Sequence, residues 1–179
     1  MLAKKIDGRN MLAKKMDYGD DFILDERTLW CHDLVSKDWS IAGYQKLCSV
    51  KNISEFWRVF NNFAKIGWKR YHFFFMRKNI LPLWEDPQNT GILLITVPIE
   101  SALEIWELLG AYFVGEILAP GTNGISVNLK GQTVTLKIWC SGESCEVHPV
   151  VAKKIEDYPK FFMNNSQRTL TDRAVNTRF

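Results

Sequence analysis

Two tryptophans lie in segments that show no apolar periodicity to bury them. Trp39 stands in the polar segment Ser36–Ser40, and Trp84 stands in Leu81–Pro87, where prolines lie on both sides of it and two carboxylates follow it. Because proline restricts the backbone around it, the second segment is predicted to be a loop. A flat cationic base held between two indoles gains both stacking and cation–π attraction. The two rings therefore indicate a site for such a base; the alternative is that both fold back onto the core.

Charged side chains near these tryptophans extend the predicted chemistry. Glu85 follows Trp84 directly and can accept hydrogen bonds from the N–H groups on the Watson–Crick edge of guanine. Hydrogen bonds to an ionised group are stronger than neutral ones. Lys130 and Lys137 lie on one face of a predicted hairpin, where they can neutralise phosphates. Together these residue types suit a positively charged purine nucleotide with a phosphate tail.

The hairpin that carries the lysines is the clearest local pattern in the chain. Ile125–Lys130 and Thr133–Trp139 each alternate apolar and polar residues, and Gly131-Gln132 between them is typical of a two-residue turn. Alternation places successive side chains on opposite faces of a strand. The predicted core face carries Ile125, Val127, Leu129, Val134, Leu136 and Ile138. The other face is predicted to be polar and basic with one indole, and carries Ser126, Asn128, Lys130, Thr133, Thr135, Lys137 and Trp139.

Helices are predicted in three places. Asn52, with Glu55 three residues later, is typical of a capping box that opens a helix. Apolar residues then recur at helical spacing, and Gly67 is predicted to end this helix. A second helix is predicted over about 99–115, and a third, entered at a proline, over Val147–Tyr158.

Further strands are predicted from runs rich in β-branched, aromatic and other apolar residues. They cover Thr28–Cys31, Tyr44–Val50, Tyr71–Met76 and Gly91–Val97. Because strands interleave with about three helices and a hairpin implies antiparallel pairing, we predict an α+β fold with an antiparallel sheet.

Length and composition predict one domain. The chain has 179 residues, enough for a single core, and 23 Lys and Arg against 20 Asp and Glu give a net charge of +3. A near repeat opens the chain, and its last segment is polar. We therefore predict a tail over 1–22, a binding domain over 23–163, and a C-terminal loop and tail over 164–179.

Several function classes are disfavoured by what the sequence lacks. No apolar run reaches the ~20 residues of a membrane helix, and the first residues have no signal-peptide core, so we expect a cytoplasmic protein. Cys31-His32 and the later Cys140, Cys145 and His148 do not match zinc-ligand spacing, so free thiols and no metal are expected. No nucleophile–base motif or phosphate-binding glycine loop appears, which indicates a binding protein without a cofactor rather than an enzyme.

Taken in order along the chain, these motifs resemble the mRNA cap-binding family of eukaryotic translation initiation factor 4E. The resemblance extends over about residues 23–142, and the final four residues also match the family's tail. The matching pieces are Leu29-Trp30, Lys37-Asp38-Trp39, Ile53–Trp57, Leu81–Asp86, Leu94–Thr96 and the hairpin from Val127-Asn128 to Ile138-Trp139.

The resemblance implies a fold and a set of site roles. The fold is a curved antiparallel sheet with three helices on its convex face and the cap on the concave face. Trp39 and Trp84 would sandwich the 7-methylguanine ring, and Glu85 would bind its N1 and N2 groups. Lys130 takes the place of the family's phosphate-binding arginine. Trp139 would lie near the methyl group, with Asn128 as a supporting polar residue.

Departures from the family pattern concern the phosphate and sugar contacts. A second phosphate-binding lysine of the family falls at Thr135, although Lys137 lies on the same face and can substitute. His72 stands where the family has an aspartate, and Ile92 where it has an arginine. An altered preference among caps is therefore a hypothesis.

A second family site lies on the helical surface. Ile53 and Trp57 match the ridge that binds a partner helix with the motif YxxxxLΦ, where Φ is apolar; Glu107 and Leu108 match a Leu-Glu pair in reversed order. The resemblance thus implies a monomer that binds capped mRNA and a scaffold like initiation factor 4G, or a repressor. The alternatives are a cap-binding-like translational repressor and a general single-stranded RNA-binding module, which would not discriminate a methylated cap.

Overall fold

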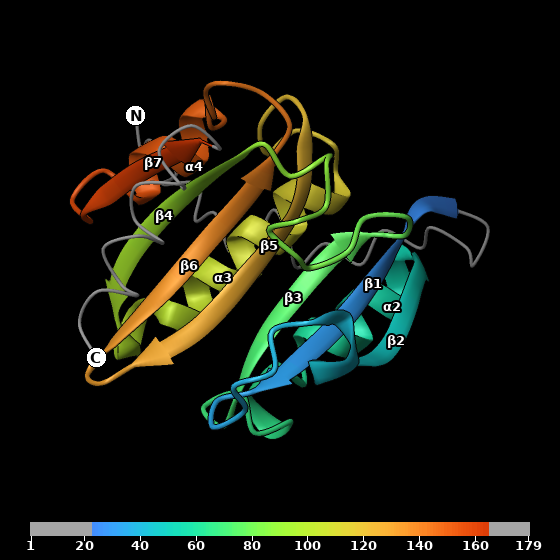
Figure 1. Cartoon of the computed structure of the whole chain (residues 1–179). Coiled ribbons are helices and arrows are strands. Elements are labelled where there is room, and N and C mark those ends of the chain that lie inside the picture. The colour runs from blue at the N-terminus through green and yellow to red at the C-terminus, as the bar shows by residue number, and fades with distance from the viewer. Residues whose placement is uncertain (1–22, 165–179) are drawn as a thin grey trace, which may run out of the picture.

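One antiparallel sheet of seven strands forms the framework, in the order β2-β1-β3-β5-β6-β4-β7 (Figure 1). The computed structural model describes residues 23–164. The strands are β1 (Ile23–Asp33), β2 (Tyr44–Asn52), β3 (Tyr71–Arg77), β4 (Gly91–Pro98), β5 (Thr122–Lys130), β6 (Thr133–Cys140) and β7 (Lys160–Asn164). Every predicted strand is present, and the sheet gains β7, which was not predicted. The terminal repeat and the C-terminal tail lie outside the described residues.

The β5–β6 hairpin has the predicted register. Lys130 pairs with Thr133 around the two-residue turn, and Gly131 has the positive φ of 62° that this turn requires. The predicted core residues of the hairpin are buried except Leu129, which is half-buried near the turn. Strand alternation therefore predicted both the pairing and the buried face.

Three α-helices, α2 (Ile53–Phe60), α3 (Ile99–Val114) and α4 (Pro149–Lys154), and two 3-10 turns, η1 (Ile41–Gly43) and η2 (Phe63–Lys65), complete the fold. The Asn52 side chain accepts a hydrogen bond of 2.8 Å from the Glu55 amide, as predicted for the N-cap. The Glu55 carboxylate accepts one of 2.7 Å from the Lys51 amide, one residue before the usual partner. Of the helices described, none has both the length and the apolar character needed to span a bilayer.

Helix α2 ends earlier than predicted, at Phe60 rather than at Gly67. The Asn62 side chain donates a 2.8 Å hydrogen bond to the Arg58 carbonyl, which satisfies a group that continued helix would have bonded. The short turn η2 follows, and Gly67, at a φ of 71°, turns the chain toward β3. The predicted third helix is also shorter, because α4 covers only Pro149–Lys154.

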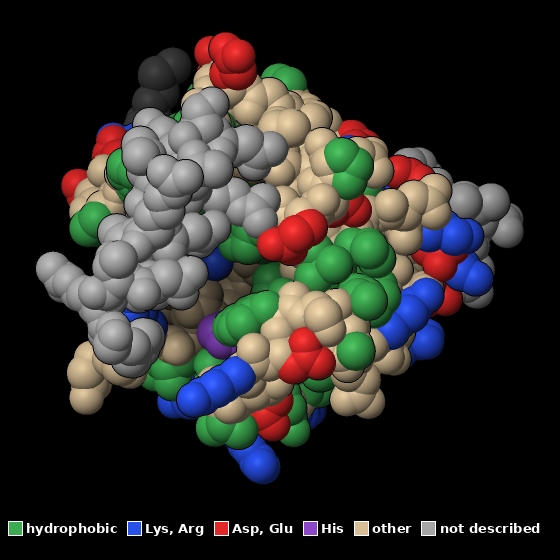
Figure 2. Space-filling model, in the orientation of Figure 1, with side chains coloured by type: hydrophobic (Ala, Val, Ile, Leu, Met, Phe, Trp, Pro, Cys, Tyr) green, Lys and Arg blue, Asp and Glu red, His purple; other side chains and the backbone are tan. Residues whose placement is uncertain are grey.

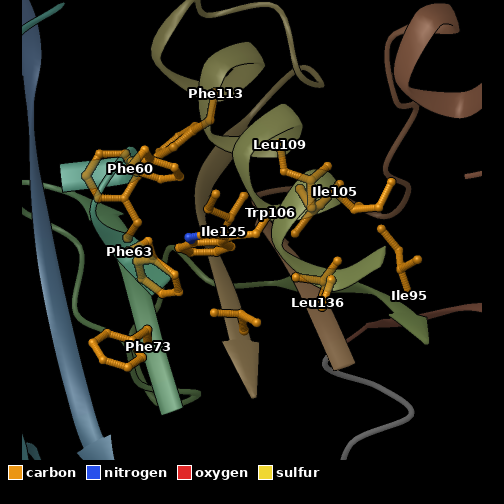
Figure 3. Close-up of a cluster of buried hydrophobic side chains, with 14 of the residues drawn as sticks. Phe60, Phe63, Phe73, Ile95, Ile105, Trp106, Leu109, Phe113, Ile125 and Leu136 are labelled. Carbon is orange, nitrogen blue, oxygen red and sulfur yellow. The ribbon is translucent and has the colours of Figure 1, made fainter. Parts of the chain in front are cut away.

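Aromatic side chains fill the space between the helices and the sheet. Trp106 of α3 stacks on Phe60 of α2 with ring centroids 5.4 Å apart and lies against Phe63, close to Ile125 of β5 (Figure 3). Val151 of α4 joins the same cluster. Because all three helices bury their apolar side chains in this cluster, they cover one face of the sheet, as the resemblance implied.

A partly exposed ion cluster around the buried Arg27 ties the segment after α3 to the sheet. Arg27 of β1 is fully buried and bonds to Asp25 and Glu116, and Arg77 of β3 bonds to the same two carboxylates. The Arg27 guanidinium lies 4.7 Å from the centroid of the Phe113 ring. The paired charges offset the cost of burying Arg27, and they fix the end of α3 against β1 and β3.

The close approach of α2 and α3 depends on a glycine, which gives a first prediction. A Cβ at Gly110 would lie 2.6 Å from Phe60 Cζ. Although alanine is the better helix former, we expect Gly110→Ala to lower the free energy of unfolding by about 1–3 kcal/mol, because the Phe60 ring must shift off Trp106. Urea denaturation measures this change. The matched variant Gly115→Ala, at a C-cap with a φ of −75°, should change stability by less than about 1 kcal/mol, and equal losses would contradict the packing argument.

Candidate functional site on the open face of the sheet

The sheet face opposite the helices carries the predicted site residues; we call it the open face. Side chains from five strands form one row across it, since the register pairs Trp30 with Phe74, Phe74 with Ser126, and Ser126 with Lys137, which also pairs with Leu94. On the face shown in Figure 2, hydrophobic side chains gather around a hollow, and a histidine side chain lies at its edge.

A second apolar cluster lies on this open face. Phe74, Met76, Ile80, Ile92 and Trp139 are buried there, and Trp30, Tyr44, Trp84 and Leu94 pack against them. Trp139 is only 1% exposed, its ring centroid lies 5.4 Å from that of Trp84, and its Nε1 donates a 2.9 Å hydrogen bond to Ser126 Oγ. Ser126 and Trp139 lie on the predicted polar face, but both are buried there, because they bond to each other and Trp84 packs against Trp139.

Buried amides shape the loop that carries Trp84. The Asn89 side chain, which is fully buried, donates to the carbonyls of Leu81 and Leu83 at 3.0 and 2.9 Å. Asn123 of β5 donates to Asn89 Oδ1 at 3.1 Å, and Asp86 accepts from the Leu81 amide at 2.8 Å. The Leu81–Pro87 loop, predicted from its prolines, is thus bonded from inside, so the Trp84 backbone is held against the sheet.

Local side-chain bonds shape the loop that carries Trp39. Asp33 accepts from the Val35 amide at 2.9 Å, and Asp38 accepts from the Ser40 amide at 2.9 Å. The Ser40 side chain, and after it this bond from the Ser40 amide, lower the pKa of Asp38. A Cβ at Gly43 would overlap the Asp38 carbonyl, so only glycine allows η1 to approach the loop this closely.

Trp39 lies on a platform of rings from three strands. Its indole is 51% exposed and stacks on His32 of β1, with centroids 4.1 Å apart and planes 7° from parallel. His72 of β3 and Tyr44 of β2 lie at 5.4 and 6.3 Å from it. One face of the Trp39 ring is therefore supported by the protein, and the other face is accessible to solvent.

The predicted polar residues fall at different depths. Lys137 is partly buried, its Nζ lies 6.0 Å from the Trp139 ring centroid, and burial lowers its pKa. Lys130 is exposed beside the hairpin turn, seven residues earlier, and pairs with Thr133. Because Thr133 and Lys137 are four residues apart on β6, about 13 Å of strand separates the two lysines. Asn128 pairs with Thr135 between them, and Glu85 is exposed beside Trp84.

Sequence reasoning missed three residues that build the site. His32 and Tyr44 support Trp39, and Asn89 organises the Trp84 loop. Tyr44 lay in a predicted strand and His32 directly followed one, but nothing in the sequence showed which ring each would meet. Asn89 resembles any polar loop residue, and only its burial distinguishes it.

The predicted partner surface lies on the helices. Ile53 and Trp57 of α2 are partly buried, and the Trp57 ring packs edge-on against Phe56 at 4.9 Å. Glu107 of α3 is exposed, and Leu108 is partly buried. Beside α2 lies a cavity of 460 Å³ with mostly apolar walls from Leu29, Leu47, Val59, Ile66, Tyr71 and Phe73 among others. Leu47 and Ile66 are about two-fifths exposed, at 41% and 40%.

Burial of His72 predicts a pH-dependent stability. Burial lowers the pKa of His72 to about 4, with smaller contributions from Lys137 and His32. The unfolded chain therefore binds a proton between pH 6.5 and 4 that the folded chain does not, so stability falls as pH falls through this window. We expect His72→Asn to reduce this loss by about 1–2 kcal/mol, after allowing for the exposed part of the ring. Chemical denaturation of both proteins at pH 7 and pH 4.5 measures the difference, and identical losses would contradict it.

Comparison of the sequence and of the fold with known proteins points to one family. The sequence profile of the family described as eukaryotic initiation factor 4E matches residues 25–170. The fold is similar to C. elegans eIF4E-3 in a complex with the 4E-binding protein Mextli and a cap analog, with 16% identity, a TM-score of 0.66, and coverage of 83% of this chain and 95% of that one. Ascaris suum eIF4E-3 in complexes with the m2,2,7G cap and the m7G cap has 18% and 15% identity and TM-scores of 0.63 and 0.61; each match covers 80% of this chain and 91% of the other. Since the family profile matches most of its length, the chain belongs to the eukaryotic initiation factor 4E family.

Proposed function

We propose that this protein binds the 7-methylguanosine cap of mRNA on its open face and links capped mRNA to translation initiation through a partner protein. It acts by binding rather than by catalysis, and it does so in the cytoplasm. The observation that carries the proposal is Trp39, a half-exposed indole that the protein supports from one side. Family membership and the cap-bound relatives point to the same ligand.

The arrangement fits a cationic purine. Trp39 and Trp84 belong to two loops on the open face, and a methylated, positively charged base between them gains stacking and cation–π attraction. Glu85 beside Trp84 is the acceptor for the N1 and N2 groups of guanine. Trp139, which is buried, packs against Trp84, so its role is to hold that ring in place near the methyl group.

The phosphate chain would follow β5 and β6. Lys137, close to Trp139, suits the phosphate nearest the base, and Lys130 near the hairpin turn suits the distal end. Asn128 lies between them as a neutral donor. The preference among caps would differ from that of the family, because Thr135, His72 and Ile92 replace charged residues of the family pattern around this path.

The base-binding role is tested with tryptophan fluorescence. Titration with 7-methyl-GTP should quench the emission, and titration with GTP should do so only at much higher concentration. Because a stacked base–aromatic pair contributes ~1–3 kcal/mol, we expect Trp39→Ala or Trp84→Ala to weaken binding of 7-methyl-GTP by about tenfold or more.

Two controls make this titration decisive. Glu85→Gln keeps the size of the side chain but removes its charge, and it should reduce the preference for guanine over adenine bases. Trp57→Phe, on the opposite side of the molecule, should bind 7-methyl-GTP like the unaltered protein. Equal quenching by GTP and 7-methyl-GTP would contradict cap recognition and favour a general RNA-binding module.

The partner site proposed here is the α2 surface with Ile53 and Trp57, together with Glu107 and Leu108 of α3. Partly exposed apolar side chains on a helix suit an amphipathic partner helix. The apolar cavity beside α2 continues this surface toward β1 and β2. The C. elegans relative in complex with a 4E-binding protein supports a partner of this kind, either a scaffold or a repressor.

The partner site is tested with a synthetic helix that carries the motif YxxxxLΦ. Trp57→Ala should reduce binding of this peptide at least tenfold while it leaves the affinity for 7-methyl-GTP unchanged, because the two sites lie on opposite faces of the sheet. Isothermal titration with each ligand measures both affinities. If the variant loses cap binding and thermal stability as well, Trp57 has a structural role instead.

A further inference from the structure

His32 covers one face of Trp39. The imidazole is 1% exposed and lies parallel to the indole at a centroid distance of 4.1 Å. Its Nε2 lies 2.7 Å from the Asp38 carbonyl oxygen, and since a carbonyl only accepts, this nitrogen carries the proton and donates. One bond therefore ties the imidazole to the loop that carries Trp39. A base can stack only on the face of Trp39 that His32 leaves accessible.

The second ring nitrogen of His32 is unsatisfied. Nδ1 is buried and has no hydrogen-bond partner within residues 23–164. With Nε2 already protonated, a second proton can only bind at Nδ1 and would create a cation directly against the indole. A positively charged base on the other face of Trp39 would then share one π system with a second cation.

We propose that His32 is a positioning and specificity-determining residue of the cap site: its neutral ring supports Trp39, and its protonation opposes the stacking of a positively charged base. This inference rests on the proposed cap-binding function. Two cations on opposite faces of one indole repel each other, and both draw on the same π electrons. The neutral form of His32 is therefore the form that accepts a methylated base.

Titratable groups from two strands and one loop lie around His32. His72 of β3 lies 6.0 Å away and Tyr44 of β2 lies 4.8 Å away, measured between ring centroids. Asp38 of the loop attracts a positive charge on His32, and its own pKa is lowered in part by that attraction. The low pKa of His72, about 4, keeps His72 neutral over the range in which His32 would be tested.

The test compares affinities for 7-methyl-GTP at pH 7.5 and pH 5.5 by fluorescence titration. His32→Phe keeps a flat ring under Trp39 but cannot be protonated, so its affinity is compared with that of the unaltered protein at the same pH. Between pH 7.5 and pH 5.5, the ratio of the two affinities should shift about five- to tenfold in favour of His32→Phe. Changes in the protonation of 7-methyl-GTP affect both proteins equally, so they cancel in the ratio of the two affinities. A ratio that does not change with pH would overturn the proposal.

Two further variants separate this effect from a structural one. His72→Asn should keep the pH dependence of the unaltered protein, because His72 is neutral at both pH values. His32→Ala removes the support and should weaken binding about tenfold at pH 7.5. Tighter binding by His32→Ala would mean that the imidazole occupies the place of the base, and it would also overturn the proposal. If the unaltered protein fails to bind at either pH, the cap-binding function itself fails; if it binds with no pH-dependent ratio, only the inference about His32 fails.

Discussion

The contact between Trp84 and Trp139 joins a loop to the sheet face that lies opposite the helices. Helices α2, α3 and α4 bury the other face, so the apolar side chains of the open face need a different cover. The Leu81–Pro87 loop provides it, and Ser126 satisfies the Trp139 N–H that burial would otherwise leave without a partner. The position of Trp84 is thus set by packing within the protein, which reduces the ordering cost of ligand binding.

The two candidate stacking residues are held by different forces. Trp84 rests on an apolar cluster that includes Trp139, and buried amides fix its loop from inside. Trp39 stacks on His32 with His72 and Tyr44 close by, and its loop is held by hydrogen bonds to Asp38, one from His32 and one from the exposed Ser40 amide. Exposed local bonds open more easily than a packed core. In the candidate site, Trp84 is therefore held more rigidly than Trp39. The loop of Trp39, next to His32, is the part that can move more easily.

Patterns that depend on neighbours in the chain were predictable from the sequence, and contacts between distant segments were not. Alternation predicted the β5–β6 hairpin, and the Asn52–Glu55 spacing predicted the start of α2. The end of α2 was missed because the Asn62 side chain, rather than Gly67, terminates it. The site loops could be located from Trp39 and Trp84. The depths of Ser126 and Trp139 could not, because they depend on how the Trp84 loop folds over them.

In the proposed site, replaced family positions would change the phosphate path while base stacking is kept. Ile92 is fully buried and pairs with Trp139 on the neighbouring strand, so an apolar side chain lies beside Trp139 where the resemblance implies an arginine. Thr135 is neutral beside Asn128, which leaves Lys137 as the charged group closest to Trp139. Burial lowers the pKa of Lys137, and a phosphate beside it would favour its charged form again. In the proposed site, phosphate binding and the charge of Lys137 would therefore reinforce each other.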